Sequence, residues 1–192
     1  MSKQGHPGVR IIAAMESTNA AAGTDNALPA SDWVRRFGRR IPPGGRILDV
    51  ACGEGRHANW FFTHGYAVNA VDRQAPARLL PGVVFKLADI ESGPWPYADQ
   101  TYEGIVVTNY LHRPLFPRLL AAVAMGGWLI YETFGVGNER YGRPSRPEFL
   151  LRPGELLEQV GGRLRVVAYE HDTIESPKPA VVQRIAAWRS PD

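Results

Sequence analysis

The sequence predicts an α/β fold in which a doubly wound, mostly parallel sheet is covered by helices on both faces. Short apolar runs that end in glycine or polar residues alternate with stretches of helical pattern along most of the chain. Successive parallel strands need a crossover, which a helix usually supplies, so this alternation is typical of an α/β sheet. With 192 residues and 44% apolar side chains, the chain can build one buried core but not two large domains.

Composition excludes several classes of protein. Charged residues make up 21% of the chain, which argues against wholesale disorder and fibrous architectures. The single cysteine, Cys52, excludes an intrachain disulfide, and the five histidines show no zinc-type spacing, so we expect no metal. No run approaches the ~18–20 apolar residues of a membrane span. We therefore expect a cytoplasmic protein with no membrane partner.

The charge balance gives little support for a nucleic-acid partner. Lys and Arg total 22 against 19 Asp and Glu, a net charge of +3, which allows nucleic-acid binding without implying it. Four basic residues surround one short helix near the start of the chain, at Arg35, Arg36, Arg39 and Arg40. Because such a group is usually a solvated face, we expect no nucleic-acid binding here.

The chain divides into a tail and one domain. Residues 1–30 contain little apolar material, and we expect a mobile tail or lid. Residues 31–192 are expected to form a single domain that opens with a short helix capped by Ser31 or Asp32. The apolar side of that helix carries Trp33, Val34 and Phe37.

Strands and helices then follow in alternation. We expect strands at residues 46–51, 67–72, 83–88, 104–108 and 128–133. Helices at 56–64 and 114–125 connect them, and glycine follows each helix. A further helix at 153–160 precedes strands at 163–170 and 181–188. Because only a loop joins these last two strands, they should pair antiparallel.

The most informative segment is a buried strand that enters a glycine turn and then a helix, ILDVACGEGR from Ile47 to Arg56. Gly53 and Gly55 allow close backbone approach to a ligand, and the helix start offers free N–H groups. Asp72 ends the next strand nineteen residues after Gly53. A carboxylate there can accept hydrogen bonds from both hydroxyls of a ribose, which favours a nucleoside site over an ordinary turn.

Two cofactor classes fit this loop. Residues 53–58, GEGRHA, satisfy the dinucleotide fingerprint G-x-G-x-x-G/A, which keeps an NAD-dependent oxidoreductase open. Against it, the negative charge of Asp49 just before the loop would oppose a pyrophosphate and favour a cationic ligand. Asp89 ends the third strand and can accept from an adenine amino group while Ile90 packs on the ring. The residues therefore favour an adenosine without phosphates.

With these motifs the chain resembles the class I S-adenosylmethionine-dependent methyltransferases, whose first motif reads roughly hydrophobic-D/E-x-G-x-G-x-G. Asp49, Gly53 and Gly55 match it, and Ala51 stands where the first glycine is usual. The tellurite-resistance and ubiquinone-biosynthesis methyltransferases are the nearest broad relatives, and residues 109–115 are similar to a little-characterised subgroup. The resemblance implies a seven-stranded Rossmann-like sheet whose last strand is antiparallel, with S-adenosyl-L-methionine as cofactor.

The resemblance also implies roles around the cofactor. The loop from Asp49 to Gly55 would hold the methionine portion. Asp72 would hold the ribose, and Asp89 with Ile90 would hold the adenine. The other cofactor-binding residues implied are Ala51, Cys52, Arg73 and Asn109.

Residues 109–113 and 132–134, at the ends of the fourth and fifth strands, should face the sulfonium, and the candidates for catalysis are among them. Methyl transfer is an in-line displacement in a site shielded from water, so positioning matters most. His112 can remove a proton from an acceptor, Tyr110 can orient the acceptor, and Arg113 can contact it. Structural roles stay open: His112 as a hydrogen-bonded loop residue, and Arg113 as the partner of an acid such as Glu132.

The eighteen-residue stretch 135–152 is the expected cover of the site, because loops of that length are often functional. It carries Arg140, Tyr141, Arg143, Arg146 and Phe149. We therefore predict a methyltransferase for a small acceptor, anionic or aromatic, with a solvated loop as the plainer interpretation. An NAD-dependent oxidoreductase, a non-catalytic S-adenosylmethionine-binding partner protein and an RNA or protein methyltransferase remain alternatives, and the pattern says nothing of oligomeric state.

Overall fold

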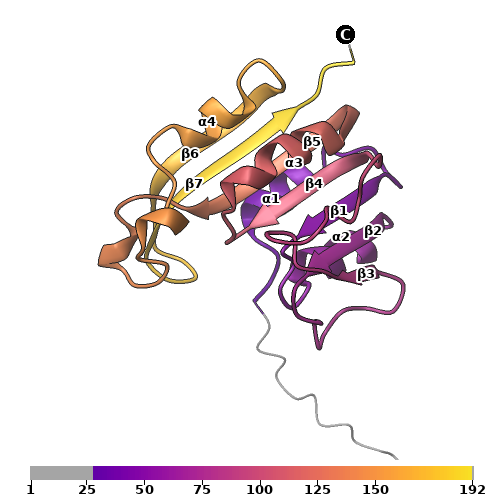
Figure 1. Cartoon of the computed structure of the whole chain (residues 1–192), viewed down its shortest axis with the longest axis horizontal. Helices are drawn as coiled ribbons and strands as arrows, with labels where there is room; N and C mark the ends of the chain where they lie inside the picture. The colour runs from indigo at the N-terminus through magenta and orange to yellow at the C-terminus, as the bar shows by residue number, and fades with distance from the viewer. Residues whose placement is uncertain (1–27, 192) are drawn as a thin grey trace, which may run out of the picture.

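The computed structural model describes residues 28–191, which build one seven-stranded sheet with helices on both faces (Figure 1). The strands lie in the order β3-β2-β1-β4-β5-β7-β6. Their bounds are β1 Arg46–Val50, β2 Ala67–Asp72, β3 Val84–Leu87, β4 Tyr102–Thr108, β5 Val123–Phe134, β6 Arg165–Ile174 and β7 Ala180–Trp188. β7 pairs antiparallel with β5 and β6, and the other pairs are parallel. The predicted fold class is confirmed.

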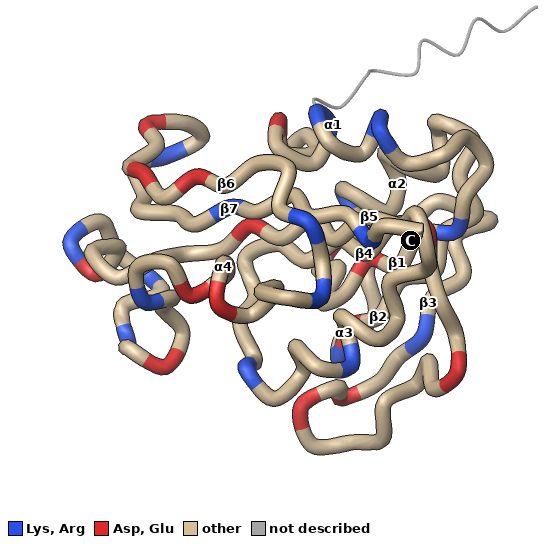
Figure 2. The backbone as a smooth tube through the Cα atoms, turned by 90° about the horizontal axis from the view of Figure 1, so that it is seen from above, with Lys and Arg blue, Asp and Glu red and all other residues tan. Residues whose placement is uncertain are grey.

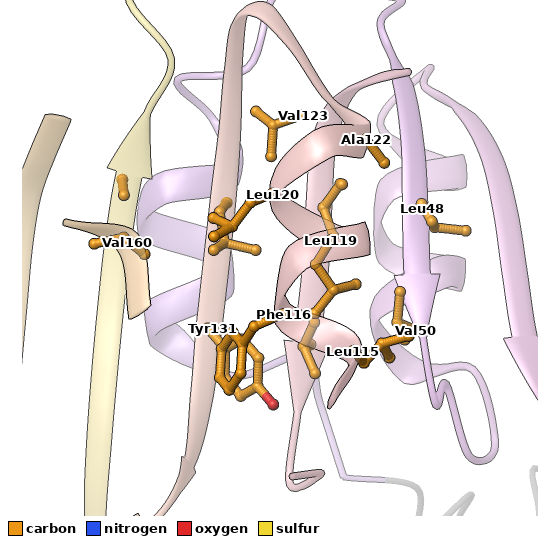
Figure 3. Close-up of a cluster of buried hydrophobic side chains, with 14 of the residues drawn as sticks. Leu48, Val50, Leu115, Phe116, Leu119, Leu120, Ala122, Val123, Tyr131 and Val160 are labelled. Carbon is orange, nitrogen blue, oxygen red and sulfur yellow. The ribbon is translucent and has the colours of Figure 1, made fainter. Parts of the chain in front are cut away.

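Two helices cover each face of the sheet. The helices are α1 Asp32–Gly38, α2 Arg56–Thr63, α3 Phe116–Ala122 and α4 Glu155–Val160, with short 3-10 helices η1 Arg113–Leu115, η2 Asn138–Arg140 and η3 Pro147–Phe149. One core cluster joins α1 and α2 to the sheet, and a second joins α3 and α4 to the opposite face. The side chains of β1 alternate between them, since Ile47 belongs to the first cluster and Leu48 and Val50 to the second. Figure 3 shows Leu119 of α3 in this second cluster.

The first helix is capped as its sequence indicates. Ser31 is the N-cap of α1, and its hydroxyl accepts a hydrogen bond from the Val34 backbone N–H at 3.1 Å. Trp33, Val34 and Phe37 are buried, as predicted. Of the tail expected at residues 1–30, residues 1–27 lie outside the described residues.

The predicted helix at 114–125 was wrong at its C-terminal end. α3 ends at Ala122, and the next residue, Val123, has extended backbone and pairs with Tyr102 at the start of β4. Val123 is 1% exposed, so its burial in the sheet decides its conformation against the local helical pattern. β5 is therefore longer than the predicted strand at 128–133.

No helix within residues 28–191 has the length and apolarity needed to cross a membrane. Basic and acidic positions are interspersed along the described chain (Figure 2).

Candidate active site

A cavity of about 370 Å³ lies at the carboxyl ends of the parallel strands. In an open α/β sheet this edge is where ligands bind. Its lining comes from the residues that follow or end β1 to β5, together with Pro144 and Phe149 of the 135–152 loop. Seven of the predicted site residues line it: Ala51, Asp72, Arg73, Asp89, Ile90, Asn109 and Tyr110.

Asp72 joins the glycine loop to the end of β2. Its Oδ2 accepts a hydrogen bond from the Gly53 N–H at 2.9 Å, and its Oδ1 accepts one from the Gln74 N–H at 3.0 Å. The Cys52 N–H donates to the Val71 carbonyl at 3.1 Å, which continues the contact between loop and strand. Because each carboxylate oxygen has two lone pairs, Asp72 retains one acceptor site on each oxygen.

The loop itself depends on left-handed backbone. Gly53 and Gly55 have φ of 54° and 78°. Ala51 also has φ of 54°, a conformation that residues with a side chain rarely adopt. This explains why glycine is usual at the position of Ala51 in the methyltransferase motif. Ala51 lines the cavity, whereas Gly53 and Gly55 are not among its lining residues.

Asp49 lies within β1, not at its end, and the structure does not bring it to the cavity. It is completely buried, and its Oδ2 accepts a hydrogen bond from the Ala58 N–H of α2 at 2.9 Å. Burial raises the pKa of Asp49 from 3.8 to about 7, although the Ala58 hydrogen bond and Arg56 oppose the rise. Of the three acidic side chains expected around one ligand, Asp72 and Asp89 line the cavity and Asp49 does not.

Cys52 is a buried part of the α1 and α2 core cluster and does not line the cavity. Burial, and then the charges of Asp49 and Asp72, raise the pKa of its thiol. The side chain therefore stays a protonated thiol near neutral pH.

Asp89 and Ile90 follow β3 and form another wall of the cavity. Asp89 accepts hydrogen bonds from the backbone N–H groups of Glu91 and Ser92 and from the Ser92 hydroxyl. The Ser92 hydroxyl is the main reason that the pKa of Asp89 is lowered. Ile90 is 6% exposed and offers an apolar surface beside this carboxylate.

The residues after β4 form the opposite wall. Asn109 has left-handed backbone, φ of 54°, and its N–H donates to the Glu132 carbonyl of β5. The Tyr110 hydroxyl is shielded from solvent and has no hydrogen-bond partner among the described residues. Burial, and then the negative charge of Glu91, raise its pKa, so it remains a hydrogen-bond donor.

His112 and Arg113 are not among the residues that line the cavity. The Nδ1 atom of His112 lies 4.0 Å from Oε2 of Glu91. Arg113 contacts both carboxylate oxygens of Glu155, at 2.6 and 3.0 Å, rather than Glu132. Its guanidinium also donates to the carbonyls of Glu148 and Leu150. Arg113 therefore holds the 135–152 loop in place, and the structure gives it no contact with the cavity.

The loop covers the cavity with apolar groups rather than arginines. Pro144 and Phe149 line the cavity, and Arg140, Arg143 and Arg146 do not. Arg146 instead pairs with Glu148 at 2.5 Å and lies over the Phe149 ring. The predicted cationic cover was wrong, because these arginines have partners within the loop or face solvent.

Several residues of the site escaped the sequence patterns. The missed cavity residues are Ala88, Glu91 and Pro144. Leu111, Thr133 and Phe134 line the cavity as the rule that ligands meet strand ends predicts. Glu91 and Pro144 belong to loops without periodicity, and only their placement in space distinguishes them.

Beside the cavity edge, a second group of buried polar side chains was also missed. His57 of α2 accepts a hydrogen bond at Nε2 from the Ser31 N–H, and its Nδ1 lies 3.3 Å from the Thr108 hydroxyl. Burial lowers the pKa of His57 to about 3, so the ring is neutral. Glu132 of β5 lies 2.6 Å from the Arg184 Nε. These contacts join the start of α1 to β4, β5 and β7.

Solved structures share this fold. TehB from Haemophilus influenzae is 18% identical with a TM-score of 0.71, and the match covers 86% of this chain and 64% of TehB. The 1,6-didemethyltoxoflavin-N1-methyltransferase of Burkholderia thailandensis, solved with 1,6-didemethyltoxoflavin and S-adenosylhomocysteine, is 16% identical with a TM-score of 0.60, covering 82% and 76%. A TehB-like S-adenosylmethionine-dependent methyltransferase from Corynebacterium glutamicum is 17% identical with a TM-score of 0.59, covering 82% and 86%. The chain thus spans less than two thirds of the TehB structure.

The sequence comparisons identify the family. No curated protein matches the sequence. A family model described as a methyltransferase domain matches residues 24–160, more than half of the chain. This match confirms the predicted methyltransferase domain. The chain belongs to the methyltransferase domain family, and its sheet has the fold of solved S-adenosylmethionine-dependent methyltransferases.

Proposed function

We propose that this methyltransferase acts on a small-molecule acceptor held in the same cavity as the cofactor. The observation that carries the proposal is the composition of the cavity of about 370 Å³. Asp72 and Asp89 lie on its walls, and Tyr110, Phe134 and Phe149 line it as well. A cavity of this size lies within the range that small ligands occupy, ~300–1,000 Å³.

The donor and acceptor groups of the cavity fit the adenosine portion of the cofactor. Asp72 retains one acceptor site on each oxygen after its bonds to Gly53 and Gln74, which suits two ribose hydroxyls. Asp89 receives three hydrogen bonds and so retains one acceptor site, which suits an adenine amino group. Ile90 supplies an apolar surface for the ring.

When bound, S-adenosylmethionine supplies a methyl group on a positively charged sulfur. The residues of this chain bind and orient the cofactor and the acceptor, and they shield both from water. The ion pair between Arg113 and Glu155 holds the 135–152 loop, which brings Phe149 to the cavity. The aromatic side chains of the lining exclude water from the cavity. The protein's contribution is chiefly the alignment of the acceptor.

One relative by fold supports a small acceptor. The Burkholderia thailandensis enzyme is named for 1,6-didemethyltoxoflavin and was solved with that compound bound.

Calorimetric titration tests the cofactor and its NAD alternative. We expect saturable heat with S-adenosylhomocysteine and none with NADH at the same concentrations. Tighter binding of NADH would reverse the ranking.

A labelling experiment tests the class of acceptor. The full chain is incubated with methyl-labelled S-adenosylmethionine and cell extract, and the products are separated into small molecules, RNA and protein. We expect label in the small-molecule fraction. Label in RNA or protein would replace the small acceptor with a macromolecule, and no label in any fraction would favour a non-catalytic binding protein.

A further inference from the structure

The cavity has an acidic lining. Three carboxylates, Asp72, Asp89 and Glu91, line it against one basic side chain, Arg73. Asp72 and Asp89 are held by hydrogen bonds from their own turns and serve the adenosine portion in the proposed function. Glu91 has no part in that assignment; its side chain is 48% exposed and lies near His112 and Tyr110, so its carboxylate can also meet another ligand group.

Glu91 lies next to the residues expected to act on the acceptor. Its Oε2 lies 4.0 Å from Nδ1 of His112, and of these two residues only Glu91 lines the cavity. Its charge also contributes to the raised pKa of the Tyr110 phenol. Glu91 therefore belongs to the cavity lining and has His112 and Tyr110 as neighbours.

The remaining lining sets the shape of the acceptor. Leu111, Phe134, Pro144 and Phe149 are apolar and line the same cavity as Tyr110. Aromatic side chains pack well on flat rings. No arginine of the 135–152 loop is among the described residues that line the cavity, so an anionic acceptor would meet three carboxylates and only one basic side chain, Arg73.

We propose that Glu91 is a catalytic residue that receives the proton of the acceptor, and that the acceptor is a planar compound methylated on a nitrogen that carries that proton. The proposal rests on the proposed function. The bond that forms joins the acceptor nitrogen to the methyl carbon of S-adenosylmethionine. The carbon–sulfur bond breaks with its electron pair left on sulfur, and the N–H proton passes to the Glu91 carboxylate, which His112 positions from behind.

Four planar probes of similar size separate the possible acceptors: benzimidazole, 2-naphthylamine, 2-naphthol and 2-naphthoate. Each is titrated by calorimetry into the full chain saturated with S-adenosylhomocysteine. We expect at least one nitrogen probe to bind on the order of tenfold more tightly than 2-naphthoate, because the Glu91 carboxylate attracts an N–H and repels an anion. Equal or tighter binding of 2-naphthoate or 2-naphthol, or binding of none of the four, would overturn the proposal.

Variants then assign the preference to Glu91. In Glu91→Gln the preference for the nitrogen probe should fall to about threefold or less, while the affinity for S-adenosylhomocysteine stays within about twofold. Glu175→Gln, an exposed change in the turn between β6 and β7, is the matched control and should leave both unchanged. A preference that survives in Glu91→Gln would reject the role of Glu91. If the unaltered chain binds no S-adenosylhomocysteine, the proposed function itself fails, a result distinct from loss of the preference alone.

Discussion

Arg113 and Glu155 form a two-point ion pair that connects the end of the β4 loop to the start of α4. The Arg113 guanidinium lies 2.6 and 3.0 Å from the two oxygens of Glu155, whose side chain is only 1% exposed. The same guanidinium donates to two carbonyls of the 135–152 loop. One side chain thus satisfies a buried charge and holds the segment that carries Phe149.

Arg113→Ala should lower the free energy of unfolding by about 2 kcal/mol. Loss of one partner of a fully buried pair costs ~3–5 kcal/mol, and the figure is smaller here because the Arg113 side chain is 35% exposed. Arg152→Ala is the control, since Arg152 also contacts Glu155 but is 65% exposed, and should cost about 0.5 kcal/mol. Urea unfolding measures both. Equal losses in the two variants would contradict a special role for Arg113.

The same pair predicts a dependence on pH. Burial by itself would raise the pKa of Glu155, but the hydrogen bonds from Arg113 and the Arg152 N–H, with both guanidinium charges, lower it below 4.5. A lowered native pKa stabilises the fold above pH 4.5, and this stability is lost as the pH falls through the native value. The difference between the unaltered chain and Arg113→Ala should therefore shrink below pH 4.5. Urea unfolding at pH 7 and pH 4 checks this, and an unchanged difference would contradict it.

Two substitutions in the glycine turn should have separate effects on stability and on ligand binding. Gly55→Ala introduces a side chain at φ of 78°, and its Cβ would lie 2.4 Å from Cδ1 of Leu79. Gly53→Ala has φ of 54°, but its Cβ would meet no atom within 4 Å. The left-handed backbone costs each about 1 kcal/mol, and Gly55→Ala should cost more because Leu79 must move.

Gly53→Ala should show its larger effect on ligand binding, because the added methyl group enters open space beside the proposed cofactor site. Thermal unfolding and titration with S-adenosylhomocysteine, carried out on both variants, separate the two effects. A larger loss of affinity in Gly55→Ala than in Gly53→Ala would contradict the placement of the ligand.

The sheet could be predicted from sequence because its signal is local. In β1 and β4, apolar side chains alternate between two core clusters, which gives runs of buried residues bounded by glycine and polar turns. The end of α3 could not be predicted, since Val123 is drawn into the sheet by its pairing with Tyr102, a contact between residues far apart in the sequence.

The candidate site also contains residues that the sequence predicts and residues that it does not. Asp72 and Asp89 were found because the ends of parallel strands meet at one edge. The role of Asp49 was misjudged because its side chain lies on the face of β1 that α2 covers, where it is buried and bonded to the Ala58 N–H. Glu155 as the partner of Arg113 depends on the path of a loop without periodicity, and no pattern in the sequence encodes that path.

Asp72→Ala should reduce the affinity for S-adenosylhomocysteine on the order of tenfold to a hundredfold. A hydrogen bond to a charged group is worth ~1.5–3 kcal/mol, and the carboxylate also holds the Gly53 N–H. Asp32→Asn, a change at a 97% exposed side chain of α1, is the matched control and should bind normally. Calorimetry gives both dissociation constants. An unchanged constant in folded Asp72→Ala would reject its assignment to the ribose.

Asp49→Asn should stabilise the fold at high pH while it weakens binding of the methyl donor. Burial raises the pKa of Asp49 from 3.8 to about 7, so the folded state favours the neutral acid. The stability that this group contributes is complete below pH 3.8 and is lost as the pH rises through about 7. Asparagine cannot ionise and retains an oxygen for the Ala58 N–H, so the variant should gain on the order of 1–3 kcal/mol relative to the unaltered chain between pH 4 and pH 8.

A comparison of two ligands that differ in the charge on sulfur tests the effect of Asp49 on binding. The negative charge of ionised Asp49 acts on Cys52 of the glycine loop. If it also reaches a bound sulfonium, Asp49→Asn should lower the affinity for S-adenosylmethionine more than that for uncharged-sulfur S-adenosylhomocysteine, by about threefold or more. Urea unfolding across the pH range and paired titrations measure the two effects. If the variant follows the pH profile of the unaltered chain, Asp49 does not ionise in this range. If both ligands lose affinity equally, its charge does not serve the sulfonium, and the carboxylate is retained only for its bond to α2.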